Sequence, residues 1–155
     1  MRYRLRMSNR RPASAALLLA QQQHLIDQVV DNDKVSRRFG LSLTEAQLLH
    51  LLVLRPELRT SRALVRQTGL PTSTVASILD RLETAGFVRR KRNAADRRVV
   101  NLEPTAKIDE IAAAYIDSPM SQRSQVVLDE MTDREIDVVR RYFARINELR
   151  SIIEN

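Results

Sequence analysis

Residues 64–102 read LVRQTGLPTSTVASILDRLETAGFVRRKRNAADRRVVNL. A helix is expected from Ser61 to Thr68, because the glycine that follows readily adopts the left-handed backbone that ends a helix. A second helix is expected from about Thr72 to Ala85, and the few residues between the two helices require a tight turn. Strands are then expected at 87–92 and 98–102. A helix, a turn, a helix and a hairpin in this order are typical of a winged helix-turn-helix.

The second of these helices has two different faces. Apolar residues follow the i, i+3, i+4, i+7 spacing of a face that points into a core: Val75, Ile78, Leu79 and Leu82. Small hydroxyls and one cation lie on the other side: Ser73, Thr74, Ser77 and Arg81. Small polar side chains let a helix enter the major groove of DNA and bond base edges or phosphates. This face therefore predicts DNA recognition, although Ser and Thr are also common on exposed helix faces.

The predicted hairpin is strongly basic around its turn at 93–95. Six Arg or Lys side chains, Arg90 among them, and a single acid lie at positions 89–98. Such a tip is expected to approach a phosphate backbone or a narrow minor groove, where negative potential is concentrated. The single acid, Asp96, is expected to pair with Arg98 or a neighbour and to hold the tip in shape.

Positive charge is concentrated in the part of the chain that contains this pattern. Residues 1–102 carry 19 basic and 8 acidic side chains, whereas residues 103–155 carry 7 basic and 11 acidic side chains. The whole chain has a net charge of +7. This asymmetry is expected when one part of a protein meets a polyanion and the other part meets protein.

The composition argues against an enzyme. The 155 residues include no cysteine, which excludes a disulfide framework and a thiolate metal site. The two histidines, His24 and His50, lie in expected helices without a carboxylate at a supporting spacing, and no glycine-rich phosphate loop occurs. We therefore expect no catalytic site, no cofactor and no metal. The lack of cysteine fits the cytoplasm, where we expect the protein to associate with the nucleoid. No apolar stretch is long enough to span a membrane.

The segment before the quoted stretch is expected to begin with an arm. Residues 1–12 are basic and are predicted to be flexible. Two interpretations of this arm are open: it contacts DNA phosphates, or it is disordered and has no role. A helix is expected from Ser14 to Asp31, followed by a polar loop over 32–40.

A further helix is expected to precede the helix-turn-helix. Thr44 and Gln47 have the spacing of a capping box, which places the helix start at Thr44. The helix is expected to end at Arg55, because the residue before a proline avoids helical geometry. Residues 58–59 could add a short strand.

The segment after the hairpin is expected to be helical. A helix is predicted over 105–118, and Pro119 either ends it or kinks it into a continuation to about Glu130. Thr132 and Glu135 then have the spacing of a second capping box at the start of the last helix.

The last helix carries more apolar residues than one packing seam requires. Such a helix is expected to bury itself against a partner subunit, although the first helix of the same chain could cover it instead. The residues of this stripe that we expect at a dimer interface are Ile136, Val139, Tyr142, Phe143, Ile146, Leu149 and Ile153.

Four short motifs occur together at a characteristic spacing: TGL at 68–70, STV at 73–75, DRLETAGFV at 80–88 and DRR at 96–98. With these motifs the chain, from about residue 14 to 153, resembles the MarR family of bacterial transcription regulators. The resemblance implies one domain over 13–155, with a winged DNA-binding lobe at 42–102 and a helical dimerisation region at 13–31 and 105–153. It also implies a triangular homodimer whose base is formed by the first and last helices, so Leu25 and Val29 join the expected interface.

The resemblance also implies roles for individual residues. It carries base recognition to Ser73, Thr74 and Ser77, wing contacts to Arg92, Asn93, Arg97 and Arg98, and the bracing of the wing to Asp96. Members of the family usually repress transcription, and many release DNA when a small aromatic or phenolic acid binds between the dimer base and the winged lobe. The chain departs from the family pattern at Pro71, where a serine is common.

Taken together, the sequence predicts a transcription regulator that binds a pseudo-palindromic stretch of double-stranded DNA as a homodimer. Repression and release by a small-molecule effector are expected from the resemblance, and no residue is assigned to the effector. The alternative is a winged helix used for contact with protein or RNA without a ligand response. Hydroxyls that can reach base edges favour DNA, because the major groove of duplex RNA is too deep and narrow for a helix to read.

Overall fold

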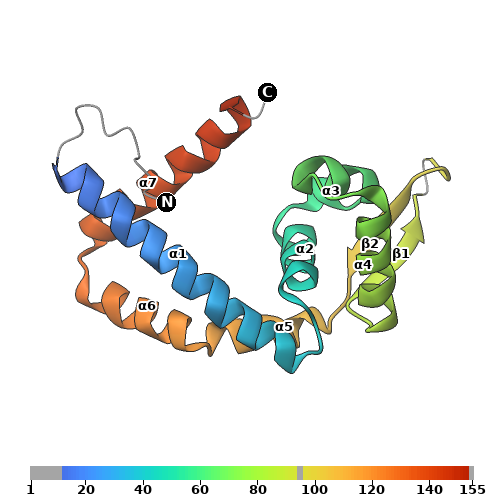
Figure 1. The fold of residues 1–155 in the computed structure, drawn as a ribbon, viewed down its shortest axis with the longest axis horizontal. Coiled ribbons are helices and arrows are strands. Elements are labelled where there is room, and N and C mark those ends of the chain that lie inside the picture. The colour runs from blue at the N-terminus through green and yellow to red at the C-terminus, as the bar shows by residue number, and fades with distance from the viewer. Residues whose placement is uncertain (1–11, 94–95, 154–155) are drawn as a thin grey trace, which may run out of the picture. The chain divides into compact units, whose positions relative to one another are not determined.

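The computed structural model describes residues 12–93 and 96–153, so most of the expected basic arm lies outside the described residues (Figure 1). The chain divides into two compact units, one that ends at Ile116 and one that begins at Asp117. The described residues form seven α-helices and one two-stranded antiparallel sheet. This confirms the predicted fold class, mainly α-helical with a small β-hairpin wing.

The first helix, α1 (Pro12–Arg38), is longer than predicted. The expected loop over 32–40 is wrong, because the chain stays helical to Arg38. Two ion pairs stabilise this last part, one of 3.0 Å between Lys34 and Asp31 and one of 2.8 Å between Arg37 and Asp33. Ion pairs three or four residues apart support a helix whose residues are otherwise polar.

Helix α2 (Leu43–Leu54) starts from a different cap than expected. The backbone N–H of Ser42 donates to the Glu45 carboxylate at 2.7 Å, and the Glu45 N–H donates to the Ser42 hydroxyl at 3.3 Å. The predicted box of Thr44 and Gln47 is therefore wrong. A glutamate carboxylate accepts a stronger hydrogen bond than a glutamine amide does, which favours the earlier of the two boxes. The predicted end of the helix at Arg55 is confirmed.

The short strand expected at 58–59 is wrong. Residues Pro56–Leu58 form a 3-10 helix, η1, with proline at its first turn, a position where the missing proline N–H costs nothing. The chain then passes beside the sheet, where the Arg59 carbonyl accepts a hydrogen bond of 2.9 Å from the Leu102 N–H.

The predicted helix-turn-helix is present. Helix α3 (Ser61–Thr68) ends at Gly69, whose φ of +68° is the left-handed conformation expected there. Helix α4 (Thr72–Thr84) follows and ends within one residue of the predicted position.

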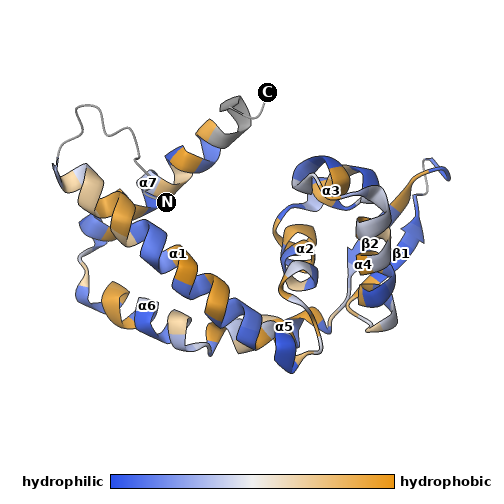
Figure 2. Cartoon of the chain, in the orientation of Figure 1, coloured by the Kyte–Doolittle hydropathy of each residue, from blue (hydrophilic) through white to orange (hydrophobic). Residues whose placement is uncertain are grey.

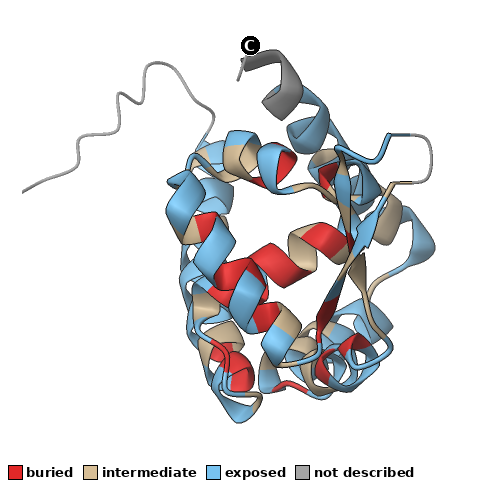
Figure 3. Cartoon of the chain, turned by 90° about the vertical axis from the view of Figure 1, so that its right-hand side faces the viewer, coloured by how far each residue is buried: buried red, intermediate tan, exposed pale blue. Residues whose placement is uncertain are grey.

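The core of the first unit forms beneath α4. The four apolar residues predicted to face inward on this helix, Val75, Ile78, Leu79 and Leu82, are all buried. They pack in one cluster with other buried residues from α2, α3, the sheet and a later helix, α5 (Ile108–Ile116), including Leu48, Leu49, Leu52, Leu64, Phe87, Leu102 and Ile111. Figure 3 shows buried residues in red on several helices and on the strands. This packing buries one face of α4 and leaves its other face exposed.

The wing is a hairpin of β1 (Val88–Arg92) and β2 (Val100–Pro104), in which Arg90 pairs with Leu102. The second strand begins two residues later than the predicted 98–102. Arg97 and Arg98 are in a turn instead. The Asp96 carboxylate accepts a hydrogen bond from the Arg98 N–H, and the Asp96 carbonyl accepts one of 3.0 Å from the Val99 N–H.

Helix α5 (Ile108–Ile116) begins three residues after the predicted start at Thr105. The Thr105 hydroxyl donates to the Gly86 carbonyl at 2.7 Å and thereby ties the end of the wing to its beginning. Within the first unit α5 also meets α1, since the Tyr115 and Ser36 hydroxyls lie 3.0 Å apart.

The second unit consists of α6 (Pro119–Glu130) and α7 (Asp133–Ile153). Pro119 does not kink a continuous helix but opens α6, and the Ser118 hydroxyl caps it by accepting from the Ser121 N–H at 3.2 Å. The predicted capping box at the start of the last helix is confirmed, because the Thr132 N–H donates to the Glu135 carboxylate at 2.9 Å and the Glu135 N–H returns a bond of 3.4 Å to the Thr132 hydroxyl.

Hydrophobic residues recur along both helices of the expected dimer base, α1 and α7 (Figure 2). Many of them are exposed. Among the predicted interface residues, six are exposed: Leu25, Val29, Val139, Phe143, Ile146 and Leu149. Ile136 and Tyr142 are partly buried, and the Ile153 side chain lies outside the described part of the structure. Among the described side chains of the second unit, only Ser118 is buried. No described helix combines the length and the apolar character needed to cross a membrane.

The packing of α4 yields a stability prediction. Leu82 is 0% exposed, so Leu82→Ala is expected to lower the free energy of unfolding by about 2–5 kcal/mol, because it removes buried methyl groups and leaves a cavity. The control is Leu54→Ala, since Leu54 is 76% exposed and a surface change of this kind costs less than about 0.5 kcal/mol. Urea unfolding at one fixed protein concentration measures both. Equal losses in the two variants would contradict the assigned core.

Candidate nucleic-acid interface

The outer face of α4 presents the predicted hydroxyls. Ser73 and Ser77 are exposed and Thr74 is partly buried. Pro71 precedes the helix and provides no side-chain hydrogen bond to its first turn. Free N–H groups at a helix start favour anions such as phosphate, so this end of α4 suits a nucleic acid backbone.

Arg81 extends from the far end of the same helix but already has a partner. Its Nε lies 2.8 Å from Oε1 of Glu45, and the side chain of Arg81 is 66% exposed whereas that of Glu45 is 3% exposed. The partner comes from α2, far away in the sequence. The structure thus directs the Arg81 side chain from α4 toward α2, where a buried carboxylate pairs with its guanidinium.

Arg90 connects the wing to α4. Its guanidinium donates to Asp80 and to Glu83 with two bonds of 2.6 Å, and its backbone N–H donates to the same Glu83 at 3.1 Å. The hydrogen bond to Asp80 is the main reason that the pKa of Arg90 is raised. Arg90 was expected to contact DNA, and the structure gives it a partner on each of two neighbouring turns of the helix.

The base of the wing carries two further ion pairs. Glu103 on β2 lies 3.0 Å from Arg89 and 3.3 Å from Lys91 on the opposite strand. The hydrogen bond from Arg89 is the main reason that the pKa of the Glu103 carboxyl is below its ordinary value, and Lys91 contributes as well. The charges of Arg89 and Lys91 are therefore partly balanced within the sheet.

The tip of the wing is different. In the described part of the chain, Arg92, Arg97 and Arg98 are exposed and have no ion-pair partner. Asp96 supports the turn through the backbone, because its Oδ1 accepts from the Arg98 N–H at 2.9 Å. Its own N–H donates to the Asn93 side chain at 3.3 Å. This arrangement holds the turn in shape and leaves three arginine side chains exposed.

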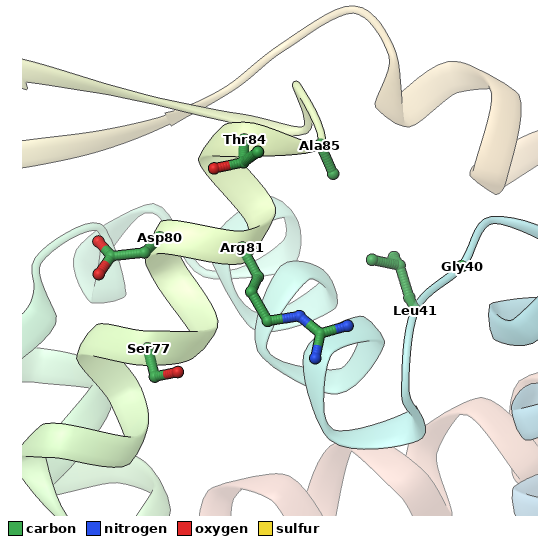
Figure 4. A pocket seen from close by; sticks show the side chains of 7 residues that line it. All are labelled: Gly40, Leu41, Ser77, Asp80, Arg81, Thr84 and Ala85. Carbon is green, nitrogen blue, oxygen red and sulfur yellow. The ribbon is translucent and has the colours of Figure 1, made fainter.

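A cavity of about 380 Å³ lies beside α4. Its lining comes from α4 and from the segment between α1 and α2: Gly40, Leu41, Ser77, Asp80, Arg81, Thr84 and Ala85. Figure 4 shows Arg81 extending toward the side of Leu41, while Asp80 points the opposite way. Sequence patterns could not predict this cavity, because its two walls are distant along the chain.

Sequence reasoning also missed Glu45, Asp80 and Glu83 as parts of the site. Each holds an arginine that had been assigned to DNA. The capping-box spacing of Ser42 and Glu45 could have drawn attention to Glu45, but its pairing with Arg81 depends on the fold.

The comparisons with known proteins agree with this geometry. Residues 39–99 match the family model described as MarR family. The HTH-type transcriptional regulator PecS of Dickeya dadantii is 32% identical over 122 residues, which are 71% of this chain and 72% of that protein. The uncharacterized HTH-type transcriptional regulator YcgE of Bacillus subtilis is 32% identical over 96 residues, 61% of this chain, and the match spans only 59% of YcgE.

Solved structures show the same fold. A MepR mutant of S. aureus, bound to an oligodeoxyribonucleotide, superposes with a TM-score of 0.56 at 14% identity, covering 90% of this chain and 98% of that one. The predicted family is confirmed, and so is the prediction that the chain is not an enzyme, because its relatives are transcriptional regulators. The chain belongs to the MarR family of transcriptional regulators.

Proposed function

We propose that this regulator represses transcription by binding a pseudo-palindromic DNA site as a homodimer. The observation that carries the proposal is the group of three exposed arginines at the wing tip, Arg92, Arg97 and Arg98, which have no ion-pair partner among the described residues. The neighbouring helix α4 carries hydroxyls on its outer face. The similarity to a MepR structure that contains an oligodeoxyribonucleotide supports it.

In the proposed complex α4 enters the major groove. Ser73, Thr74 and Ser77 would bond base edges or nearby phosphates. Arg92, Asn93, Arg97 and Arg98 would lie at the flanking minor groove and its phosphates, with Asp96 bracing the turn. Arg90 would act indirectly by fixing the wing against α4. Because arginine contacts to phosphates release counterions, binding is expected to weaken steeply as salt rises.

The dimer is proposed to form through α1 and α7. On α7 an apolar hollow of about 550 Å³ is lined by Val138, Arg141, Tyr142, Arg145, Ile146 and Leu149. The second unit buries little of its own apolar surface, as the exposure of Val139 and Phe143 illustrates, and such a surface is expected to need a partner. In the dimer the two copies of α4 would lie about 34 Å apart, one turn of the DNA helix.

Release by a small aromatic or phenolic acid is the regulatory part of the proposal. The cavity beside α4 is the proposed site for the acid, because Arg81 is in its lining with an exposed side chain. Asp80 also lines the cavity but points away from Arg81 (Figure 4). Such a ligand would displace DNA only if it binds the arrangement that cannot hold DNA more tightly than the one that can. A cytoplasmic location, where the chromosome would be accessible, is part of the same proposal.

Selection from a pool of random duplexes tests the function directly. The wild-type protein is expected to enrich duplexes with two related half-sites whose centres are about 10 base pairs apart, because that spacing matches one helical turn. Sequencing of the bound pool measures the spacing, and an RNA duplex of equal length serves as the control. A preference for RNA, or a bound pool without any common sequence, would refute the proposal.

The wing gives a second prediction. Arg97→Ala is expected to weaken binding to the selected duplex by about 1–3 kcal/mol if the side chain enters a groove. Arg134→Ala is the matched control, because it removes the same charge from an exposed position on α7. Fluorescence anisotropy at moderate salt measures both affinities. An Arg97 variant that binds as tightly as the Arg134 variant would exclude Arg97 from the interface.

The dimer seam gives a third prediction. Ile146→Glu places a charge in the apolar hollow of α7 and is expected to produce monomers that bind DNA poorly, since burying an unpaired charge is costly. Leu54→Glu puts the same charge on an exposed apolar residue of α2 and should leave the oligomer unchanged. Sedimentation equilibrium gives the mass of each variant. Dimers of unchanged stability in the Ile146 variant would exclude this seam.

A further inference from the structure

Glu45 uses its two carboxylate oxygens for two different purposes. Oε2 accepts from the N–H and the hydroxyl of Ser42, at 2.7 Å and 2.9 Å, and so caps α2. Oε1 lies 2.8 Å from Nε of Arg81 on α4. One side chain therefore joins the start of α2 to the helix that is proposed to read DNA.

The burial of Glu45 makes this joint stiff. Its side chain is only 3% exposed, and a buried carboxylate is costly unless hydrogen bonds and an opposite charge compensate it. Arg81 supplies the opposite charge, so a movement of Arg81 away from Glu45 would leave a buried charge unpaired. The side chain of Arg81 is 66% exposed, so it remains accessible to solvent.

We propose that Glu45 is a positioning residue for DNA recognition, which fixes α4 against α2 through Arg81. This inference rests on the proposed DNA binding and adds to it a residue outside the reading face. On this view Arg81 is held by protein and is not a phosphate contact. Its removal should reduce the preference for the correct sequence and should leave the salt dependence of binding unchanged.

Both flanks of α4 are then held by arginine and carboxylate. On one flank Arg81 reaches back to α2, and on the other Arg90 reaches from the wing to Asp80 and Glu83. A helix held on both sides cannot rotate freely about its axis. Its hydroxyls therefore keep one orientation, which sequence-specific contacts require.

The chain contains a matched control for Glu45. Glu135 makes the same capping box at the start of α7, where its Oε2 accepts from the Thr132 N–H at 2.9 Å and from the Thr132 hydroxyl at 2.7 Å. Glu135 is exposed, and in the described part of the chain it has no arginine partner. A glutamine at either position keeps one oxygen for the cap, but only at position 45 does it remove a charge that faces an arginine.

The test compares Glu45→Gln, Arg81→Gln, the double variant and Glu135→Gln in the full-length protein. The DNA probes are a duplex selected by the wild-type protein and a scrambled duplex of equal composition. Each single change at the joint is expected to lower the ratio of the two affinities by about 3- to 30-fold, as for directly coupled residues. The double variant should lose no more than either single variant, because the second change has no remaining interaction to break. Glu135→Gln should match the wild type.

Two further measurements separate positioning from general stability. The slope of log affinity against log salt should be the same for Arg81→Gln and the wild type, and the amides of α4 should exchange faster in Glu45→Gln than in Glu135→Gln. The inference is overturned if Glu45→Gln behaves like Glu135→Gln. It is also overturned if Arg81→Gln weakens both duplexes equally and lowers the salt slope by about one, because Arg81 is then a phosphate contact. A wild-type protein without preference for any duplex would overturn the proposed function instead, and amide exchange would still decide whether Glu45 restrains α4.

Discussion

The contacts of Arg90 with Asp80 and Glu83, both 2.6 Å, hold the wing and α4 as one piece. A two-stranded hairpin is only marginally stable alone, so the wing needs this attachment to keep its tip at a fixed place beside the helix. The Glu83 carboxylate also accepts the backbone N–H of Arg90, which fixes the main chain of the strand as well as its side chain. The distance between the arginine tip and the hydroxyl face depends on this clamp.

The basic residues of α4 and of the wing fall into two groups, those with an acidic partner and those without one. Arg81, Arg89, Arg90 and Lys91 are paired with acids of the same unit, whereas Arg92, Arg97 and Arg98 are not paired within the described residues. Surface ion pairs contribute little to stability in general. Here they balance some of the positive charges and leave others without an acidic partner, which a polyanion could then bind. The uncompensated charge of the wing lies at its end, where a narrow groove would concentrate the opposite potential.

Local patterns predicted the fold well where one signal dominated. Gly69 marked the end of α3, and the spacing of Val75, Ile78, Leu79 and Leu82 identified the buried face of α4. Prediction failed where two local signals competed, as at Ser42 and Thr44, which both could cap α2. It also failed where a tertiary contact set the start of an element: the Thr105 hydroxyl donates to the Gly86 carbonyl, and α5 begins after it. The partners of Arg81 and Arg90 could not be read from the sequence, because a charge run does not show which acids the fold brings near it.

The helices after Asp117 have almost no interior of their own, since Ser118 is their one buried residue among those whose side chains are described. Helices without a shared core are weakly stable in water. If a second copy of the chain supplies the missing core, folding of this region and association become a single equilibrium. Dilution would then loosen α6 and α7 while the winged lobe, which has its own packed cluster, stays folded.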